Sequence, residues 1–431
     1  MLSVLNWEYL TPAEKNQILM RPKSNTSVSN QVMSIINQVR MGGDDALYSL
    51  TQQFDGAQLA TLQIPEYKIQ QATIKSNAMN AINKAIKTIT TYHQELLPEN
   101  KTIQTATGIT ITNTYKPIQK VGLYVPGGNN TPLISSLLMQ AIPAKVAGCP
   151  VKVLCTPPDE QGEINPHLLV AARLCGIKTI YSLGGAQAIA AMAYGTPSIM
   201  KVDKLFGPGN SYVTEAKNQV ARDPHGAAID MPAGPSEVMI TADQNANPAF
   251  IAADLLAQSE HGIDSQVILL CDTLELAEAV NAQLHIQMRC LLRKNLIEQS
   301  LTHGAILVCP ELSEQIRIIN TYAPEHLIVN RNNGASLVDK IQAVGTIFLG
   351  AWAAETMGDY ITGSNHVLPT HGYARNHSGL GTVDFLTRFS VQSIDSQGIK
   401  SLGPAAITLA QLEGLDAHAN AVQIRLNALE V

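Results

Sequence analysis

The 431-residue chain contains no cluster of lysine or arginine, and its formal net charge is -6. A partner such as nucleic acid or an anionic membrane requires a concentrated positive field, so the composition argues against both. No uninterrupted apolar span reaches transmembrane length, and the first eight residues lack a basic start followed by an apolar core. We therefore expect a cytoplasmic protein that acts on a small soluble substrate.

The six cysteines lack the paired spacing that is typical of a structural metal site. Several of them lie in apolar, strand-like runs, as Cys155 and Cys309 do. The sequence therefore predicts reduced, buried thiols.

A complete G-x-G-x-x-G dinucleotide-binding turn is also absent, because Tyr212 stands where a third glycine would follow Gly207 and Gly209. Four glycine turns nevertheless occur, at 126–128, 184–185, 207–210 and 233–236. Helix N-termini behind such turns can bind phosphate through free backbone N–H groups, which is one interpretation. The other is that the glycines serve only tight strand-to-helix turns.

The length suggests two main domains with appendages. The first hundred residues predict helices at 12–20, 27–54 and 66–97. Short apolar runs then alternate with helical stretches, which is typical of parallel βαβ units. The predicted strands form two series, at 121–125, 151–155, 179–183 and 204–206, and at 238–240, 266–270, 305–308, 326–329 and 346–349.

We therefore predict an α/β fold with two Rossmann-like parallel sheets and helical appendages at both ends. The predicted division is a helical appendage at 1–22, one α/β domain at 23–120 and 237–380, a second at 121–236, and a helical tail at 381–431.

Two stretches carry side chains that bind metals. Gln258 and His261 are three residues apart at the end of a helical pattern that begins near Pro248, so they are expected on one helix face. Asp359 must come from another element, within a glycine-dotted loop that runs to His366. The alternative is that the histidine is structural or solvated, and that the Asp and Asn of the loop only bond backbone in a turn.

Glu325 and His326 follow Pro324 and open an apolar strand. At the mouth of a sheet such a pair supplies two groups that can take protons, as the oxidation of an alcohol requires. By contrast His418, near the chain end, is by default a solvated histidine.

Seven separated motifs carry a resemblance to a known family. They are VGLYVPGG at 121–128, GGAQAI at 184–189, FGPGN at 206–210, DMPAGPSE at 230–237, QSEH at 258–261, PEH at 324–326, and GDY at 358–360 with NHVLP at 365–369. In this order and over nearly the whole chain, the sequence resembles the histidinol dehydrogenases. That family oxidises L-histidinol to L-histidine through histidinaldehyde, the last step of histidine biosynthesis, with two NAD molecules and one zinc ion per site.

The resemblance implies a role for each matching residue. The zinc ligands would be Gln258, His261, Asp359 and His418, the last supplied by the other subunit of a domain-swapped homodimer. Glu325 and His326 would be the catalytic pair, and Tyr124, Gln187 and Asn210 the NAD contacts. Ser236, His366 and Glu413 would bind substrate together with His326 and the zinc ligands.

Three alternatives remain open at this point. A zinc hydrolase would use Gln258, His261 and Asp359 to hold water, with Glu325 as base and no nucleotide. A paralogous dehydrogenase would oxidise another amino alcohol. Aldehyde oxidation could also use a cysteine, Cys149 or Cys155, although neither has a neighbour in sequence that would lower its pKa.

Overall fold

The computed structural model describes residues 2–22, 28–127, 133–232 and 234–429. Gly128 and Ala233, two positions in the predicted glycine turns, and Ser27, the predicted start of a helix, lie outside the described residues. Within the described part, no helix combines the length and the apolar character that crossing a membrane requires.

A five-stranded parallel sheet occupies the middle of the chain. Its strands are β4 (Lys120–Tyr124), β5 (Val151–Thr156), β6 (Thr179–Ser182), β7 (Lys204–Phe206) and β8 (Ala228–Ile229), in the spatial order β6-β5-β4-β7-β8. Four of these match the first predicted series, so the prediction of a parallel sheet here is confirmed.

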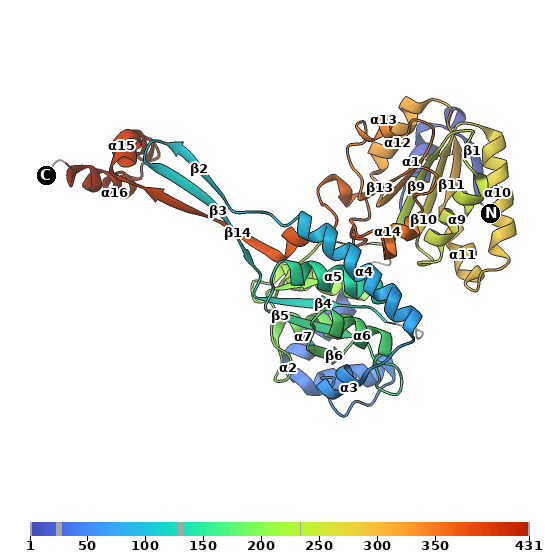
Figure 1. Cartoon of the computed structure of the whole chain (residues 1–431), viewed down its shortest axis with the longest axis horizontal. Helices are drawn as coiled ribbons and strands as arrows, with labels where there is room; N and C mark the ends of the chain where they lie inside the picture. The colour runs from blue at the N-terminus through green and yellow to red at the C-terminus, as the bar shows by residue number, and fades with distance from the viewer. Residues whose placement is uncertain (1, 23–27, 128–132, 233, 430–431) are drawn as a thin grey trace.

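Helices cover both faces of this sheet (Figure 1). One core contains residues of α3 (Glu66–Gln71), α4 (Ser76–Glu95), α5 (Ile134–Val146) and α6 (Pro166–Leu174). The other contains residues of α2 (Ser29–Asp55), α7 (Gly185–Tyr194) and α8 (Ser211–Arg222).

The second sheet has six parallel strands, in the order β1-β11-β10-β9-β12-β13. They are β1 (Ser3–Asn6), β9 (Glu237–Ala242), β10 (Gln266–Cys271), β11 (Ala305–Val308), β12 (His326–Asn330) and β13 (Thr346–Leu349). On one face lie α9 (Pro248–Ser259), α10 (Leu274–Met288) and α11 (Lys294–Ser300). A 3-10 turn at Leu301–His303 follows α11 directly. On the other lie the 3-10 turn Trp7–Tyr9, α1 (Pro12–Ile18), α12 (Leu312–Tyr322) and α13 (Ala335–Val338).

The remaining elements form a long arm that projects away from both sheets (Figure 1). Its base follows the short helix α14 (Glu355–Tyr360) and two 3-10 turns, Tyr373–Arg375 and Thr382–Phe385. A three-stranded antiparallel sheet, in the order β14-β3-β2, is built from β2 (Lys101–Ala106), β3 (Ile109–Pro117) and β14 (Leu386–Ile394). At the tip, α15 (Ser396–Leu412) packs against α16 (Asp416–Asn427).

The structure corrects the predicted appendages. The segment 1–22 is not purely helical, because β1 forms the edge of the six-stranded sheet. The segment 381–431 is not purely helical either, because β14 pairs with β3 over nine residues. The arm strands are rich in threonine. β2 and β14 are largely exposed and β3 is largely half-buried, so these strands lack the apolar runs by which the other strands were predicted.

The predicted grouping of residues 23–120 with 237–380 is also wrong. Helices α2, α3 and α4 pack on the five-stranded sheet of the middle segment, with Leu47 and Ile89 fully buried there. The predicted helix at 66–97 is two helices, because the backbone is extended at Ala72 and Lys75, which lie between them. This break lets Ile69, Ile74 and Ile82 all face one core.

Candidate active site

The predicted catalytic pair, Glu325 and His326, lies where β9 and β12 begin. These strands are neighbours, and the pairing of His326 with Val238 places Glu325 beside Glu237. The Glu237 N–H donates to Oε2 of Glu325 at 2.8 Å, and the Glu237 carbonyl lies 3.1 Å from Nδ1 of His326. The first residue of β9 therefore holds both members of the pair through its backbone.

His326 has one nitrogen engaged and one nitrogen free. With the Glu237 carbonyl as partner, Nδ1 carries the proton and Nε2 keeps its lone pair. Among the described residues, Nε2 is buried without a hydrogen-bond partner, 3.8 Å from Oδ1 of Asp359. Burial lowers the pKa of His326 to about 3, so the ring is neutral and the lone pair of Nε2 is not occupied by a proton.

Two acids reach the pair from α14. Glu355 and Asp359 are four residues apart, and Oε1 of Glu355 lies 3.8 Å from Nδ1 of His326. Asp359 lies 4.0 Å from Nε2 of His261. One ligand atom from each of His261, Glu355 and Asp359 falls within 4.8 Å of the others.

Gln258 and His261 come from the end of α9, as the sequence predicted. Asn247 caps the helix start by accepting from the Ala249 N–H, and the helix runs to Ser259. His261 is not on the helix face, however, but in the turn beyond it, where its N–H donates to the Gln258 carbonyl. Asp359, predicted in a loop, is on a helix, which fixes its spacing from Glu355.

The Gln258 amide is fully buried, and its surroundings assign its orientation. Its nitrogen donates to Oε1 of Glu355, and its oxygen then lies 3.0 Å from the Glu237 N–H. Gln258 therefore joins the same small group of side chains as Glu325 and His326.

Burial raises the pKa of the acids here. The pKa values of Glu325 and Glu355 lie well above the usual range, and that of Asp359 rises to about 6. Three crowded carboxyl groups beside neutral histidines form a site that a divalent cation would stabilise. The mixed oxygen and nitrogen donors fit zinc in a catalytic rather than a closed, thiolate-rich structural site.

His366 is positioned by a loop that spans from α14 to the other sheet's helices. Its Nδ1 lies 2.7 Å from the Asp359 carbonyl, which ties the ring to α14. The neighbouring Asn365 donates to the Met139 carbonyl of α5 at 2.6 Å and lies 3.4 Å from Nε2 of His93 of α4. The other predicted substrate contact, Ser236, directly precedes β9, and its carbonyl accepts from the Gln266 N–H.

Glu413 and His418 are not brought to this group within one chain. Both are exposed at the tip of the arm, Glu413 at the end of α15 and His418 in α16 (Figure 1).

The three predicted NAD contacts gather at the carboxyl edge of the five-stranded sheet. Tyr124 ends β4, and its hydroxyl accepts from the Gly185 N–H at the start of α7, where Gln187 is buried. Asn210 follows β7 and caps α8 by accepting from the Tyr212 and Val213 N–H groups at 3.1 Å. This is the edge at which open parallel sheets bind ligands.

A cavity of about 1190 Å³ lies beside this edge, lined by residues that follow β4 and β5 and by the end of α2. Pro126, Gly127, Pro157 and Asp55 are in its wall, whereas Tyr124, Gln187 and Asn210 are not. The cavity therefore adjoins the predicted contacts without containing them.

The cysteine alternative finds no support. Cys149 and Cys155 are buried in the five-stranded unit, and burial raises the pKa of Cys149 to about 11 and that of Cys155 further. The expectation of buried thiols holds for five of the six cysteines, and is wrong for Cys290, which is exposed.

Sequence reasoning missed two residues of this site. Glu355 carried a usable signal, since it stands four residues before Asp359 and both would share one helix face. Glu237 carried none, because it acts through its backbone and only the strand pairing places it.

Known proteins match the chain over its whole length. The family model described as histidinol dehydrogenase matches residues 19–426. The chain belongs to the histidinol dehydrogenase family. A histidinol dehydrogenase of Legionella pneumophila is 68% identical, with 100% of each chain covered, and one of Colwellia psychrerythraea is 46% identical, with 98% of each covered.

A solved structure agrees with this family assignment, and a second shows a likeness of fold. The crystal structure of histidinol dehydrogenase from Elizabethkingia anophelis matches with a TM-score of 0.96 and 41% identity, covering 100% of this chain and 99% of that one. A putative aldehyde dehydrogenase from Burkholderia cenocepacia matches with a TM-score of 0.51 and 13% identity, covering 90% and 88%, which is a likeness of fold alone.

Proposed function

We propose that this chain oxidises L-histidinol to L-histidine through histidinaldehyde, the last step of histidine biosynthesis, with two NAD molecules and one zinc ion per site. Membership of the histidinol dehydrogenase family supports the substrate. The observation that carries the chemistry is the neutral, buried His326, whose free Nε2 faces the acids of α14. Oxidation of an alcohol requires such a base.

The ligands we propose for zinc are Gln258, His261, Asp359 and the partner subunit's His418. Zinc bound there would hold the imidazole and amino nitrogens of histidinol and so orient the reacting carbon. Ser236, His366 and the partner subunit's Glu413 are proposed to complete the substrate site. Glu355 supports the group by accepting from the Gln258 amide.

Proton transfers fall to the pair on β12. In the first oxidation, Nε2 of His326 accepts the hydroxyl proton while the carbinol carbon loses hydride to NAD. In the second, Glu325 would remove a proton from the water that adds to the aldehyde. His326, having released its first proton to solvent, would accept the proton of the hydrate while the carbon loses hydride to a second NAD. Glu325 must first be ionised, which nearby positive charge favours.

We propose Tyr124, Gln187 and Asn210 as NAD contacts. Their shared place at the carboxyl edge of the five-stranded sheet, where open parallel sheets bind ligands, supports this role. The Asn210 oxygen already caps α8, so its amide nitrogen is the group left to bind NAD.

The arm is the basis for proposing a domain-swapped homodimer. Its β-strands and terminal helices expose many apolar side chains, among them Val391, Leu409 and Leu412. An isolated arm of this kind would leave them in water, so we propose that it packs on a second copy and delivers Glu413 and His418 there.

The two rival readings make different predictions. A zinc hydrolase requires no nucleotide, so Asn210→Ala or Gln187→Ala would leave its turnover unchanged, whereas NAD affinity falls in a dehydrogenase. A paralogue would keep NAD reduction but prefer another amino alcohol. Family membership favours histidinol over both.

The test is NADH absorbance from purified protein, zinc, NAD and L-histidinol, with histidine quantified at the end. Two NADH per histidine, lost on chelation and restored by zinc, is the expected result. Absence of NADH from folded protein with zinc bound would reject histidinol as the substrate.

A further inference from the structure

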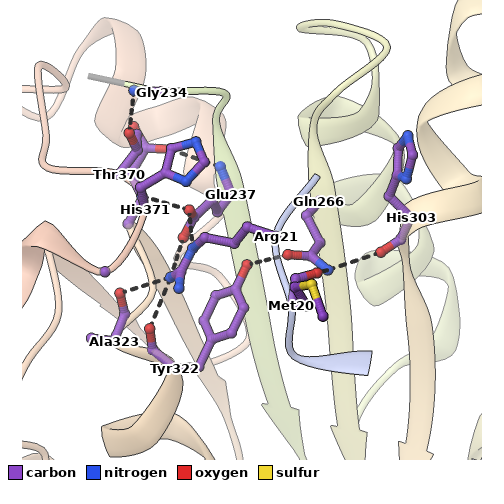
Figure 2. A network of polar contacts seen from close by, with 12 residues as sticks. Met20, Arg21, Gly234, Glu237, Gln266, His303, Tyr322, Ala323, Thr370 and His371 are labelled. Carbon is purple, nitrogen blue, oxygen red and sulfur yellow. Dashed lines mark hydrogen bonds and ion pairs between the residues drawn. The ribbon is translucent and has the colours of Figure 1, made fainter. Parts of the chain in front are cut away.

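Arg21 has no role in the proposed mechanism. It nevertheless contacts Glu237 at the start of β9 and the turn that leads from α12 to Glu325 and His326 (Figure 2). It follows α1, and its guanidinium forms two hydrogen bonds with the buried Glu237 carboxylate, from Nε to Oε1 at 2.5 Å and from Nη2 to Oε2 at 2.8 Å. Such a bidentate pair fixes orientation as well as charge.

The same guanidinium binds the turn that precedes the pair. Nη2 also donates to the Tyr322 carbonyl at 2.8 Å and to the Ala323 carbonyl at 3.3 Å, and the group lies 3.9 Å from the centre of the Tyr322 ring. These carbonyls end α12, where a cation is favourable. Ala323 has a φ of 53°, a conformation that a residue other than glycine adopts only when its surroundings hold it.

Pro324, Glu325 and His326 follow this turn directly. One cation therefore ties together the start of β9 and the approach to β12. Because the Glu237 backbone binds both Glu325 and Nδ1 of His326, the position of Glu237 decides where each catalytic side chain points.

Further hydrogen bonds lie on or beside the same carboxylate. The His371 N–H donates to Oε1 of Glu237 at 2.7 Å, and Thr370 accepts from the Gly234 N–H at 2.6 Å (Figure 2). Tyr322 donates to Gln266, whose amide in turn donates to the Met20 carbonyl. The charged pair is thus the centre of a network that reaches from the N-terminal segment to the catalytic strands.

We propose that the Arg21–Glu237 pair is a positioning device for the catalytic pair: it holds the Glu237 backbone so that His326 keeps its proton on Nδ1 and presents a free Nε2. Arg21 touches neither member of the pair and acts through Glu237. The kinetic test of this role rests on the proposed function, because it measures oxidation of histidinol. The spectroscopic test does not, because it measures only the tautomer of His326.

The carboxyl ends of the same strands contain a second arginine–carboxylate pair, which serves as a matched control. Arg331, at the end of β12, donates from Nη2 to both carboxylate oxygens of Asp272 at 2.8 and 2.7 Å and binds the Ala242 carbonyl. This pair has the same chemistry and joins the carboxyl ends of the strands, far along β12 from His326. Arg331→Ala therefore measures the loss of such a pair without disturbing the catalytic residues.

The kinetic experiment compares zinc-loaded wild type with Arg21→Ala, Glu237→Gln, the double variant and Arg331→Ala. We expect each single change at the pair to lower kcat for histidinol about 10- to 100-fold, with the KM for NAD little changed and no further loss in the double variant. Arg21→Lys should recover part of the activity. Arg331→Ala should lose thermal stability but keep kcat.

The spectroscopic experiment needs no turnover. In protein labelled with 15N in its histidine rings, the His326 signals, identified by their loss in His326→Gln, should report a proton on Nδ1 in wild type and a mixture of tautomers in Arg21→Ala. If Arg21→Ala does not fold, the same tautomer measurement is made on Glu237→Gln and Arg21→Lys.

Unchanged kcat and tautomer in the folded Arg21 and Glu237 variants would overturn the proposal, as would an equal loss of kcat in Arg331→Ala. If wild type makes no NADH from histidinol, the proposed function fails, and the tautomer spectra still decide the role of Arg21.

Discussion

At the scale of single residues, burial decides which groups can exchange protons. His326 is 4% exposed and its pKa is lowered to about 3, so it is neutral at physiological pH with one nitrogen free. Glu325 is equally buried and its pKa is raised. The imidazole and the carboxyl thus have opposite pKa shifts from one cause, because burial disfavours charge of either sign.

His326→Asn should test the base directly. We expect kcat for histidinol to fall about 10²- to 10⁴-fold, the range for loss of a general base, while zinc content and fold are kept. The exposed His285 on α10 is the control, and His285→Asn should retain full activity. A loss of less than tenfold in His326→Asn would show that another group takes the proton.

Asp55 should make stability depend on pH. One oxygen of its carboxyl is buried without a hydrogen-bond partner among the described residues, and burial raises its pKa from 3.8 to about 6. Folding therefore favours the protonated form. The contribution of Asp55 to stability is fully present below about pH 4 and is lost as pH rises through 6.

Asp55→Asn should avoid that loss. Relative to wild type, its free energy of unfolding should be equal near pH 4 and greater by on the order of 1–2 kcal/mol at pH 7.5, a value reduced for partial exposure. Asp44 provides a control of opposite sign, because hydrogen bonds from Ser198 and Thr196 lower its pKa. Asp44→Asn should destabilise at neutral pH, and parallel behaviour of the two variants in chemical denaturation would contradict the argument.

At the scale of elements, the short helix α14 carries two site residues and depends on a close approach to the sheet. A Cβ at Gly358 would lie 2.4 Å from the Phe348 ring of β13, which lies next to β12. Only glycine lets the helix pack at this distance, and Glu355 and Asp359 stand on either side of it.

Gly358→Ala should therefore displace α14. We expect a loss of about 1–3 kcal/mol in stability, typical of overpacking, together with weaker zinc retention on chelator titration. Gly262→Ala is a matched control beside His261, since a Cβ at this position would lie 3.9 Å from Oγ of Ser265, an ordinary contact distance. Equal zinc retention in the two variants would mean that α14 tolerates the shift.

At the scale of the molecule, the arm separates Glu413 and His418 from the rest of the proposed site (Figure 1). These two residues can contribute to an active site only if they reach the site of a second chain. Testing this requires two different variants combined in one dimer.

Inactive His326→Asn and His418→Asn chains should restore activity when refolded together. If His418 serves the other subunit, a mixed dimer has one site with both defects and one intact site, and random pairing recovers about a quarter of wild-type activity. If His418 served its own chain, every site would stay defective. Light scattering of the mixture verifies that dimers form.

The sequence by itself determined the two parallel sheets, because alternating apolar runs and helices leave few other arrangements. It also determined the family, through motifs that the full-length match bears out. The helix that begins near Pro248 and the strand that opens after Pro324 followed from local periodicity and a proline, and the structure ends α9 at Ser259 and begins β12 at His326.

Only the tertiary structure decided where the helices of 29–95 pack, that the arm is a sheet, and that Arg21 binds Glu237, whose carbonyl contacts His326. Exposed strands rich in threonine lack an apolar signature, and Arg21 and Glu237 lie 216 residues apart. A contact made through backbone atoms or across such a separation depends on how elements pair in space, and local residue patterns carry no information about that pairing.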